Sequence, residues 1–419
     1  MSSTIAVEDL RVGIFIQLDG GWLSHPFPLS NFRISSADQI ATLRGLGLPR
    51  VRWVPEKSDP PAPEGGANDS APAGSASSVN AAEVARQQHR QALQAQRDAA
   101  QRCERQHAEA ATAWRAATDA IGARPQDAGR STEQLTRAIL EKMLMAEEVG
   151  IRLVAGGGDR AASHALNVSV ISLLIARTLG LSEPELLDLG VGALMHDVGK
   201  TEVADRFRHA EEGFSANELS AYRDHVAKGV SLGQRMALSA GALRVLAQHH
   251  EQADGSGFPL KLGGERLTVA ARVVALVNRY DNLCNPQART LALTPHEAVS
   301  VLFAQGRQRF DAAVLNAFIR MMGVYPAGSL VQLTDDRYAI VMGVNSCRPL
   351  KPRVLVHEPK VPRADALVLD LEHNPDLGIR RSLPAAKLPP AAVEYLDPRP
   401  RVAYYFEPLA RHVPEELAA

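Results

Sequence analysis

Histidines recur on successive helix-forming segments in the middle of this chain. These segments and the polar cluster behind them contribute, in order, His164, His196, His225, His249, His250, Asn278 and Asp281. The segment SHALNVSVISLLIARTLG is apolar on nearly every face, which predicts a buried helix. A helical bundle can bring inward side chains from several helices to one centre. Because divalent metals at hydrolytic centres favour imidazole nitrogen and carboxylate oxygen, the sequence predicts an all-α core around a metal site.

The dipeptide His196-Asp197 stands near the expected end of a helix that Gly199 terminates. Adjacent side chains cannot share one face of a regular helix, but at a helix end they can converge. A carboxylate has two oxygens and can bridge two metals, and paired metals about 3.5–4 Å apart can clamp a phosphodiester. Lys200 follows and could hold a phosphate oxygen as a point charge.

Each of these features also has a plainer structural explanation. A single buried histidine is more often a hydrogen-bonded core residue than a ligand, and a His-Asp dipeptide recurs by chance. Five histidines on successive segments, ending in HHEQADGSG, favour a joint metal site over purely structural roles.

The rest of the chain divides by composition and periodicity. Residues 1–57 predict a small α+β domain, with alternation around Ile14 and Ile16, a helix capped at Ser36 and a strand near Val51. Residues 58–80 lack large apolar side chains and predict a disordered linker. Residues 81–130 are rich in Ala, Gln and Arg and predict a helical spacer, with a dimerising coiled coil as the alternative.

Residues 131–323 form the predicted helical core, with capping boxes at Ser182 and Ser215. Residues 324–419 predict a β-rich extension, with a hairpin turn at Asp335-Asp336. The expected strands are 330–333, 338–344, 354–357, 367–371 and 402–406.

Composition narrows the class of protein. The formal net charge is −1, which argues against a dedicated partner of nucleic-acid polymers. Cys103, Cys284 and Cys347 have no CxxC spacing, so neither a disulfide framework nor a thiolate zinc site is expected, in keeping with a reducing compartment. The chain opens without a signal-peptide pattern, and no run approaches the ~20 apolar residues of a membrane span. We expect a soluble cytoplasmic protein.

The motifs SHALNV, ALMHDVGK, the lone His225 and HHEQADGSGFP occur in the order that is typical of the HD-GYP domain. Residues 133–322 resemble this branch of the HD metal-dependent phosphohydrolases. Residues 1–57 resemble the uncharacterised domain that often precedes HD-GYP domains in bacterial proteins. The resemblance implies an all-helical fold, a binuclear metal centre and hydrolysis of the bacterial messenger cyclic di-GMP to pGpG and sometimes GMP.

Position by position, the resemblance implies roles for individual residues. Asp197 would bridge the two metals, Lys200 would approach the substrate phosphate, and the loop Gly257-Phe258-Pro259 would contact substrate, with Arg289 as a further candidate. The implied metal ligands are His164, His196, Asp197, His225, His249, His250 and Asn278.

Four positions depart from the family pattern. Phe258 replaces the usual tyrosine, which keeps the ring and loses the hydroxyl. Asn278 replaces a carboxylate ligand by a neutral amide. Arg160 stands where some members place a glutamate for a third metal, so two metals are expected, Fe or Mn by donor type. The arginine that the family has downstream of its DxxDA motif has no clean counterpart here, and Arg289 is the nearest candidate.

The leading hypothesis is a cyclic di-GMP phosphodiesterase. The alternative is a degenerate domain that senses the nucleotide, or that serves as a scaffold for a partner such as a diguanylate cyclase, and Asn278 and Phe258 motivate it. A third reading is a phosphohydrolase for another nucleotide, against which HHEQADGSGFP counts. A homodimer is compatible with the long helix.

Overall fold

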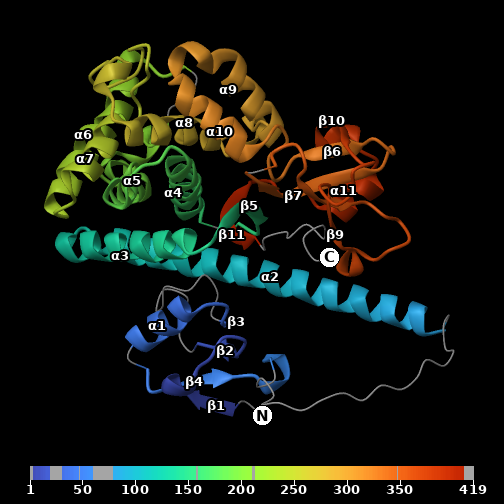
Figure 1. The fold of residues 1–419 in the computed structure, drawn as a ribbon. Helices are drawn as coiled ribbons and strands as arrows, with labels where there is room; N and C mark the ends of the chain where they lie inside the picture. The colour runs from blue at the N-terminus through green and yellow to red at the C-terminus, as the bar shows by residue number, and fades with distance from the viewer. Residues whose placement is uncertain are drawn as a thin grey trace. The chain divides into compact units, whose positions relative to one another are not determined.

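The computed structural model describes residues 3–18, 31–46, 48–59, 79–156, 159–209, 213–346 and 348–409, which form two units that divide between Ala95 and Gln96 (Figure 1). Nearly all of the linker predicted at residues 58–80, and Cys347, lie outside these residues.

In its described residues, the N-terminal unit contains a small antiparallel sheet, one short helix and the first part of a long helix that continues beyond it. The sheet order is β1-β4-β2-β3, and its elements are β1 (Ser3–Ala6), β2 (Phe15–Gln17), β3 (Asn31–Arg33), α1 (Ala37–Gly45) and β4 (Arg50–Trp53). Ser36 caps α1 by accepting a hydrogen bond from the backbone of Gln39. Ile16, Ile34 and Leu43 are fully buried in its core. Strand β2 lies in the segment that alternates around Ile14 and Ile16, and β4 includes Val51, as the sequence predicted.

The long helix α2 (Val79–Ala120) enters the second unit at Gln96. From there it is packed rather than solvated, because Cys103, Ala110 and Ala117 are buried along it. The indole of Trp114 donates to the backbone carbonyl of Leu194 at 2.8 Å. Because this segment has few large apolar residues, its sequence suggested an exposed spacer. Small alanine side chains, however, also allow a helix to pack closely against its neighbours.

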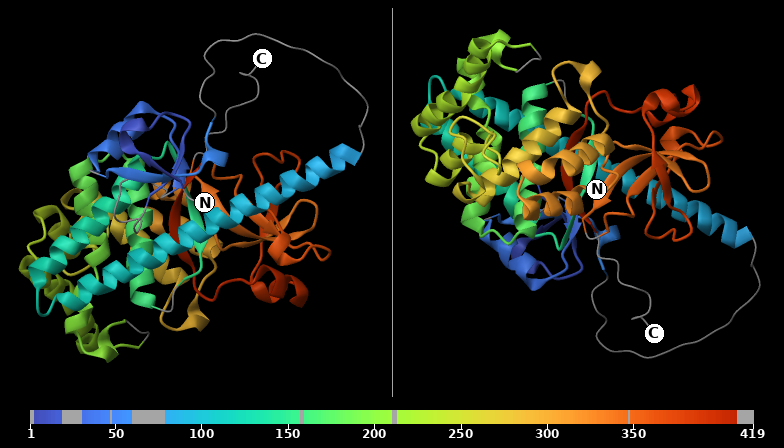
Figure 2. Two further views of the ribbon diagram at one scale, coloured as in Figure 1. Left: turned by 90° about the horizontal axis from the view of Figure 1, so that it is seen from below. Right: turned by 90° about the horizontal axis from the view of Figure 1, so that it is seen from above.

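The helical core of the second unit lies at one end of that unit, beside a sheet at the other (Figure 2). Its helices are α3 (Pro125–Leu144), α4 (Arg160–Thr178), α5 (Glu183–Met195), α6 (Ala216–Arg235), α7 (Ala240–Gln248), α8 (Val269–Cys284), α9 (Pro295–Arg309) and α10 (Ala312–Met322). The capping boxes predicted at Ser182 and Ser215 are both formed. The central helix α4 packs against α5 and α8 and buries most of its side chains, as its sequence predicted.

The helix α4 corrects one expectation. This helix is long and apolar enough to cross a membrane, whereas no apolar run of that length was expected from the sequence. Within its 18-residue apolar window, 72% is buried inside the protein, which is the setting of a core helix.

The sheet of the second unit has seven strands, all paired antiparallel. They are β5 (Glu148–Val154), β6 (Leu330–Leu333), β7 (Tyr338–Asn345), β8 (Arg353–Val356), β9 (Val368–Asp370), β10 (Ile379–Ser382) and β11 (Ala403–Leu409), with a short helix α11 (Pro390–Leu396) before the last. Asp336 has φ of +69° in the β6–β7 turn. The five strands expected after residue 323 are present, within one to three residues at each end.

Strand β5 was not expected, because it lies between two helices of the core. It pairs with β11 along seven residues and also with β7. Because β11 also contacts α4, the C-terminal sheet is fixed directly beside the helix that carries His164.

Candidate metal centre

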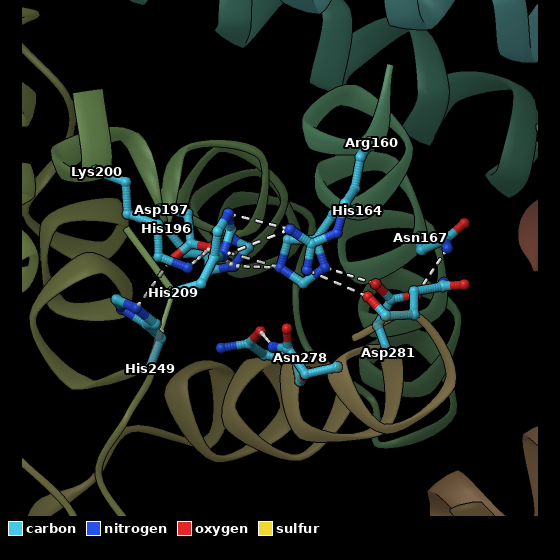
Figure 3. Close-up of polar contacts among 12 residues, drawn as sticks. Arg160, His164, Asn167, His196, Asp197, Lys200, His209, His249, Asn278 and Asp281 are labelled. Atoms are coloured by element: carbon cyan, nitrogen blue, oxygen red, sulfur yellow. Dashed lines mark hydrogen bonds and ion pairs between the residues drawn. The ribbon is translucent and has the colours of Figure 1, made fainter. Parts of the chain in front are cut away.

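Asp197 lies between two groups of histidines (Figure 3). Its Oδ2 atom is 3.6 Å from Nε2 of His164 and 3.5 Å from Nε2 of His196. Its Oδ1 atom is 3.6 Å from Nε2 of His225 and 3.7 Å from Nε2 of His249. Each oxygen of this carboxylate therefore faces its own group of imidazoles, as in a carboxylate that bridges two metal ions.

The ends of two helices supply adjacent pairs of these residues. His196 caps the C-terminus of α5 and Asp197 follows it, while His249 caps α7 and His250 follows. His250 belongs to the group of His225 and His249, and the ligand atoms in each group lie within 4.8 Å of one another. Because the backbone leaves the regular helix at both points, two consecutive side chains can point into one centre.

Gly199 has a different role from the one expected. Helix α5 ends at Met195, and Gly199 lies in the following 3-10 turn, Val198–Glu202. A Cβ atom at Gly199 would lie 1.9 Å from the carbonyl oxygen of His225. The residue must be glycine because this turn touches the backbone of α6, not because it terminates a helix.

The Nδ1 atoms of four histidines are held by acceptors. His196, His225 and His249 donate from Nδ1 to the carbonyl oxygens of the residues three positions earlier, at 2.8, 2.6 and 2.8 Å. His164 donates from Nδ1 to Oδ2 of Asp281 at 2.6 Å. In each ring the hydrogen on Nδ1 leaves the lone pair on Nε2, the nitrogen that faces the centre.

These lone pairs face one another in pairs. Nε2 of His164 is 3.2 Å from Nε2 of His196, and Nε2 of His225 is 3.4 Å from Nε2 of His249. Two acceptors at such a distance repel unless a proton or a cation lies between them. Two imidazole nitrogens bound to one ion at about 2.1 Å would lie about 3.0–3.4 Å apart. The donor set thus fits a metal ion in each group.

The buried Oδ1 atom of Asp197 has no hydrogen-bond partner among the described residues. An unsatisfied carboxylate oxygen inside a protein is costly unless a cation compensates it. This orphaned oxygen points toward the group of His225 and His249, so it fits a second metal on that side.

The protonation states agree with metal binding. Burial lowers the pKa of His225 to about 3 and shifts the pKa values of His196 and His250 in the same direction, which keeps these rings neutral. Burial opposes ionisation of Asp197, but the charge of Lys200 is the largest of the effects that outweigh burial, and the pKa of Asp197 lies well below its usual value.

His164 differs from the other rings. Burial lowers its pKa, but hydrogen bonds to Asp197 and Asp281 outweigh burial and raise the pKa of His164 to about 9. The two carboxylates thus attract a positive charge to this position, and a metal ion bound to Nε2 would supply that charge in place of the proton.

Asp281 was named in the sequence only as part of a polar cluster, and the structure gives it a role behind His164. Besides accepting from His164, its Oδ1 atom accepts from the amides of Asn167 and Asn285 at 2.7 and 2.9 Å. Asn167 lies three residues after His164 on α4, so the two side chains share one face of this helix. A carboxylate behind a ligand histidine fixes the orientation of the ring and increases its basicity.

Asn278 lies on α8 below the histidines, on the same helix as Asp281 (Figure 3). It is buried, and its side-chain oxygen accepts a hydrogen bond from Asn282 at 2.6 Å. The amide oxygen that was expected as a ligand is therefore already shared with a neighbour.

Lys200 donates to Oδ2 of Asp197 at 2.6 Å and lies over the ring of Tyr222. The hydroxyl of Tyr222 is 3.4 Å from Nε2 of His250. Tyr222, three residues before His225 on α6, thus adds a hydroxyl group at the centre that no sequence motif indicated.

The loop after His250 packs against the centre through Phe258. The Phe258 ring stacks on the His250 ring with centroids 4.4 Å apart. Gly255 has φ of +76°, and a Cβ atom at Gly257 would lie 2.4 Å from the backbone of Glu251. The buried Glu251 carboxylate accepts from two backbone amides of residues 260 and 262 and so closes the loop. Pro259, by contrast, is exposed.

Arg289 lines a cavity of about 290 Å³ that also reaches His164 and Asp281. Arg160 lines the same cavity and donates to Gln287 at 2.6 Å. The structure thus places Arg289 beside the His164 side of the centre and the loop of Phe258 beside the His250 side.

Comparison with known proteins agrees with this geometry. Residues 2–130 match the family described as a domain of unknown function, DUF3391, and residues 139–314 match the HD domain. The chain is 28% identical over 362 residues to the cyclic di-GMP phosphodiesterase PA4108 of Pseudomonas aeruginosa, covering 85% of each chain. It is 33% identical over 156 residues to the cyclic di-GMP phosphodiesterase response regulator RpfG of Xanthomonas campestris, covering 36% of this chain and 41% of RpfG.

Among solved structures, Bd1817, an HDG"Y"P protein from Bdellovibrio bacteriovorus, aligns over 76% of this chain and 98% of its own, at 14% identity and a TM-score of 0.41. The chain thus carries a DUF3391 domain ahead of an HD domain, and its relatives named cyclic di-GMP phosphodiesterases confirm the resemblance to HD-GYP proteins.

Proposed function

We propose that this protein hydrolyses cyclic di-GMP at a centre of two divalent metal ions that share Asp197. The observation that carries the proposal is the placement of the two Asp197 oxygens, each facing a separate group of imidazole Nε2 atoms. The relatives named as cyclic di-GMP phosphodiesterases support the choice of substrate.

Paired divalent ions at such a centre activate water and stabilise the charge that develops on a phosphodiester. His164 and His196 would hold one ion, and His225, His249 and His250 the other. The nitrogen-rich donor set favours Fe or Mn over Mg. Arg160, whose guanidinium group turns toward Gln287 and His209, offers no ligand for a third ion.

Lys200 has three N–H donors, of which Asp197 accepts one. We assign the others to a nonbridging oxygen of the substrate phosphate, where a fixed ammonium group stabilises developing negative charge. Asp281 keeps His164 in one tautomer and orientation throughout. On the opposite side, Phe258 shields His250 from solvent by stacking on it.

The experiment is metal analysis of protein purified without oxygen, together with chromatography of cyclic di-GMP reaction products. The wild type should contain two metal ions per chain and release pGpG or GMP. Asp197→Ala should lose bound metal and turnover while keeping its helical circular dichroism. Asp224→Ala, an exposed carboxylate on α6 beside His225, is the matched control and should resemble the wild type. Full activity and unchanged metal content in Asp197→Ala would contradict the assignment.

A second candidate function is nucleotide binding without turnover. The observation in its favour is the hydrogen bond from Asn282 to the side-chain oxygen of Asn278, which competes with metal coordination at that position. Under this reading the wild type binds cyclic di-GMP but releases no product under saturating Fe or Mn.

Association with a diguanylate cyclase, a homodimer and a cytoplasmic location stay predictions. The buried free thiols of Cys103 and Cys284 support a reducing compartment.

A further inference from the structure

The cavity of about 290 Å³ beside the metal centre is lined by arginines from two distant parts of the chain. Arg160 and Arg289 come from the helical core, and Arg399 and Arg401 come from the segment that leads into β11. The same cavity reaches the ligand His164 and its partner Asp281. Segment 399–402 therefore forms one wall of this cavity, beside His164.

This segment is held in place by the residues that also orient Asp281. The carbonyl oxygen of Val402 accepts hydrogen bonds from the side-chain amides of Asn167 and Asn285 at 3.1 and 2.9 Å. The backbone N–H of Val402 donates to the side-chain oxygen of Asn285 at 3.0 Å. The N–H of Tyr404 donates to Asn167 at 2.8 Å. Because both asparagines also donate to Asp281, one hydrogen-bond network joins the arginine wall to the ligand His164.

The charge in the cavity is strongly positive. Asp281 is its one acidic lining residue among those described, and both its oxygens are already engaged by His164 and the two asparagines. Arg399 lies 3.8 Å from Asp397, which leaves its charge only partly compensated. Burial, and then the charge of Arg401, lower the pKa of Arg160, so the guanidinium groups act on one another.

Two of the arginines have no partner in the described part of the chain. The guanidinium groups of Arg289 and Arg401 make no hydrogen bond or ion pair there, and the Nε atom of Arg401 is buried without an acceptor. A buried donor that stays unsatisfied, such as the Nε atom of Arg401, destabilises the protein, and more so when the group is charged. An anion in the cavity would satisfy these donors.

We propose that Arg401 and Arg289 form a subsite for the phosphate of the cyclic dinucleotide that is not being cleaved. A guanidinium group matches two phosphate oxygens with parallel N–H donors, which suits this ligand better than an ammonium group. The volume is near the lower end of the roughly 300–1,000 Å³ of small-molecule sites, so the cavity accommodates part of a dinucleotide while the other part lies at the metals. The C-terminal extension thus takes part in substrate recognition.

The inference rests on the proposed function, and steady-state kinetics with two substrates test it. Cyclic di-GMP carries two phosphodiesters, whereas bis(p-nitrophenyl) phosphate carries one and reaches only the metals. Arg401→Ala and Arg289→Ala should each raise KM for cyclic di-GMP about tenfold or more, with a much smaller effect on bis(p-nitrophenyl) phosphate. Arg401→Lys should recover only part of the loss. Arg380→Ala is the matched control, because Arg380 pairs with Asp336 in the same extension and lies outside the cavity.

An unchanged KM for cyclic di-GMP in both alanine variants would overturn the subsite. Equal losses with both substrates would also overturn it, since they would indicate damage to the metal centre. If the wild type neither binds nor hydrolyses cyclic di-GMP, the proposed function fails, and calorimetric titration with inorganic phosphate then decides on the subsite alone. Weaker phosphate binding by Arg401→Ala than by the wild type and Arg380→Ala supports it; equal binding by all three rejects it.

Discussion

Nδ1 of His164 lies 2.6 Å from Oδ2 of Asp281, although 117 residues separate the two in the chain. The contact joins α4 to α8 and leaves Nε2 of His164 directed at Asp197 and His196. A ligand ring that is oriented in this way loses less freedom when a metal binds. Asp281 would therefore act on a bound metal through His164.

Replacing Asp281 by asparagine should weaken the metal on the His164 side. Either His164 or the amides of Asn167 and Asn285 would then face an NH2 group in place of an acceptor. Removing such a partner typically costs 10- to 100-fold in metal affinity. Chelator competition measures the affinity, and circular dichroism checks the fold. Asp224→Asn on α6 serves as the control, and a metal affinity equal to that of the control would show that Asp281 has only a structural role.

Lys200→Ala should lower kcat/KM for cyclic di-GMP by about ten- to one-hundredfold, because a charged hydrogen bond contributes roughly 1.5–3 kcal/mol. Metal occupancy should stay the same, since Lys200 is not a ligand. The matched control is Lys228→Ala on α6, whose ammonium group donates to the carbonyl oxygen of Glu202. Wild-type kinetics in Lys200→Ala would limit this residue to its ion pair with Asp197.

Glu407 on β11 accepts from Arg152 on β5 at 2.9 Å and also pairs with Arg353 on β8. Both Arg152 and Glu407 side chains are only 9% exposed, so Glu407→Gln leaves two guanidinium groups with little compensation. Breaking such a buried pair costs about 3–5 kcal/mol. Urea denaturation should show a clear loss of stability. Glu358→Gln, which breaks an exposed pair with Arg337, should cost less than about 1 kcal/mol. Equal midpoints for the two variants would contradict this difference.

Local patterns in the sequence predicted the elements that local interactions determine. The capping boxes at Ser182 and Ser215 and the turn at Asp336 are examples, since their partners lie within a few residues. The motifs mark seven expected ligand positions, and six of them, all but Asn278, meet in two groups that share Asp197.

Features that depend on distant partners were not predictable in this way. Strand β5 lies in a region that the sequence predicts as helical, and it is a strand because β7, about 190 residues downstream, and β11, about 250 residues downstream, pair with it. The same holds for the contact of Val402 with Asn167 and Asn285, which no spacing within one segment could indicate. Helix α2 was misjudged because its alanines can face either water or a packed neighbour.

Asn278 is the position at which the enzyme and sensor readings divide. If its amide oxygen is a ligand, Asp197 is the only carboxylate in the first coordination sphere of two divalent cations. An amide brings no charge and already accepts from Asn282, so metal on that side should bind less tightly than it would with a carboxylate. Asn278→Asp should therefore tighten metal binding, most visibly when metal is limiting, without changing the fold.

Turnover by the same variant separates the two readings. If the protein is an enzyme, the wild type already hydrolyses cyclic di-GMP at saturating metal, and Asn278→Asp lowers the metal concentration that it needs. If it is a sensor, the wild type binds the nucleotide without product, and the variant gains activity. The matched control is Asn282→Ala, which frees the Asn278 oxygen without adding charge and should shift metal affinity less. If Asn278→Asp alters neither metal affinity nor turnover, residue 278 is not a ligand, and the metals are held by the histidines and Asp197 alone.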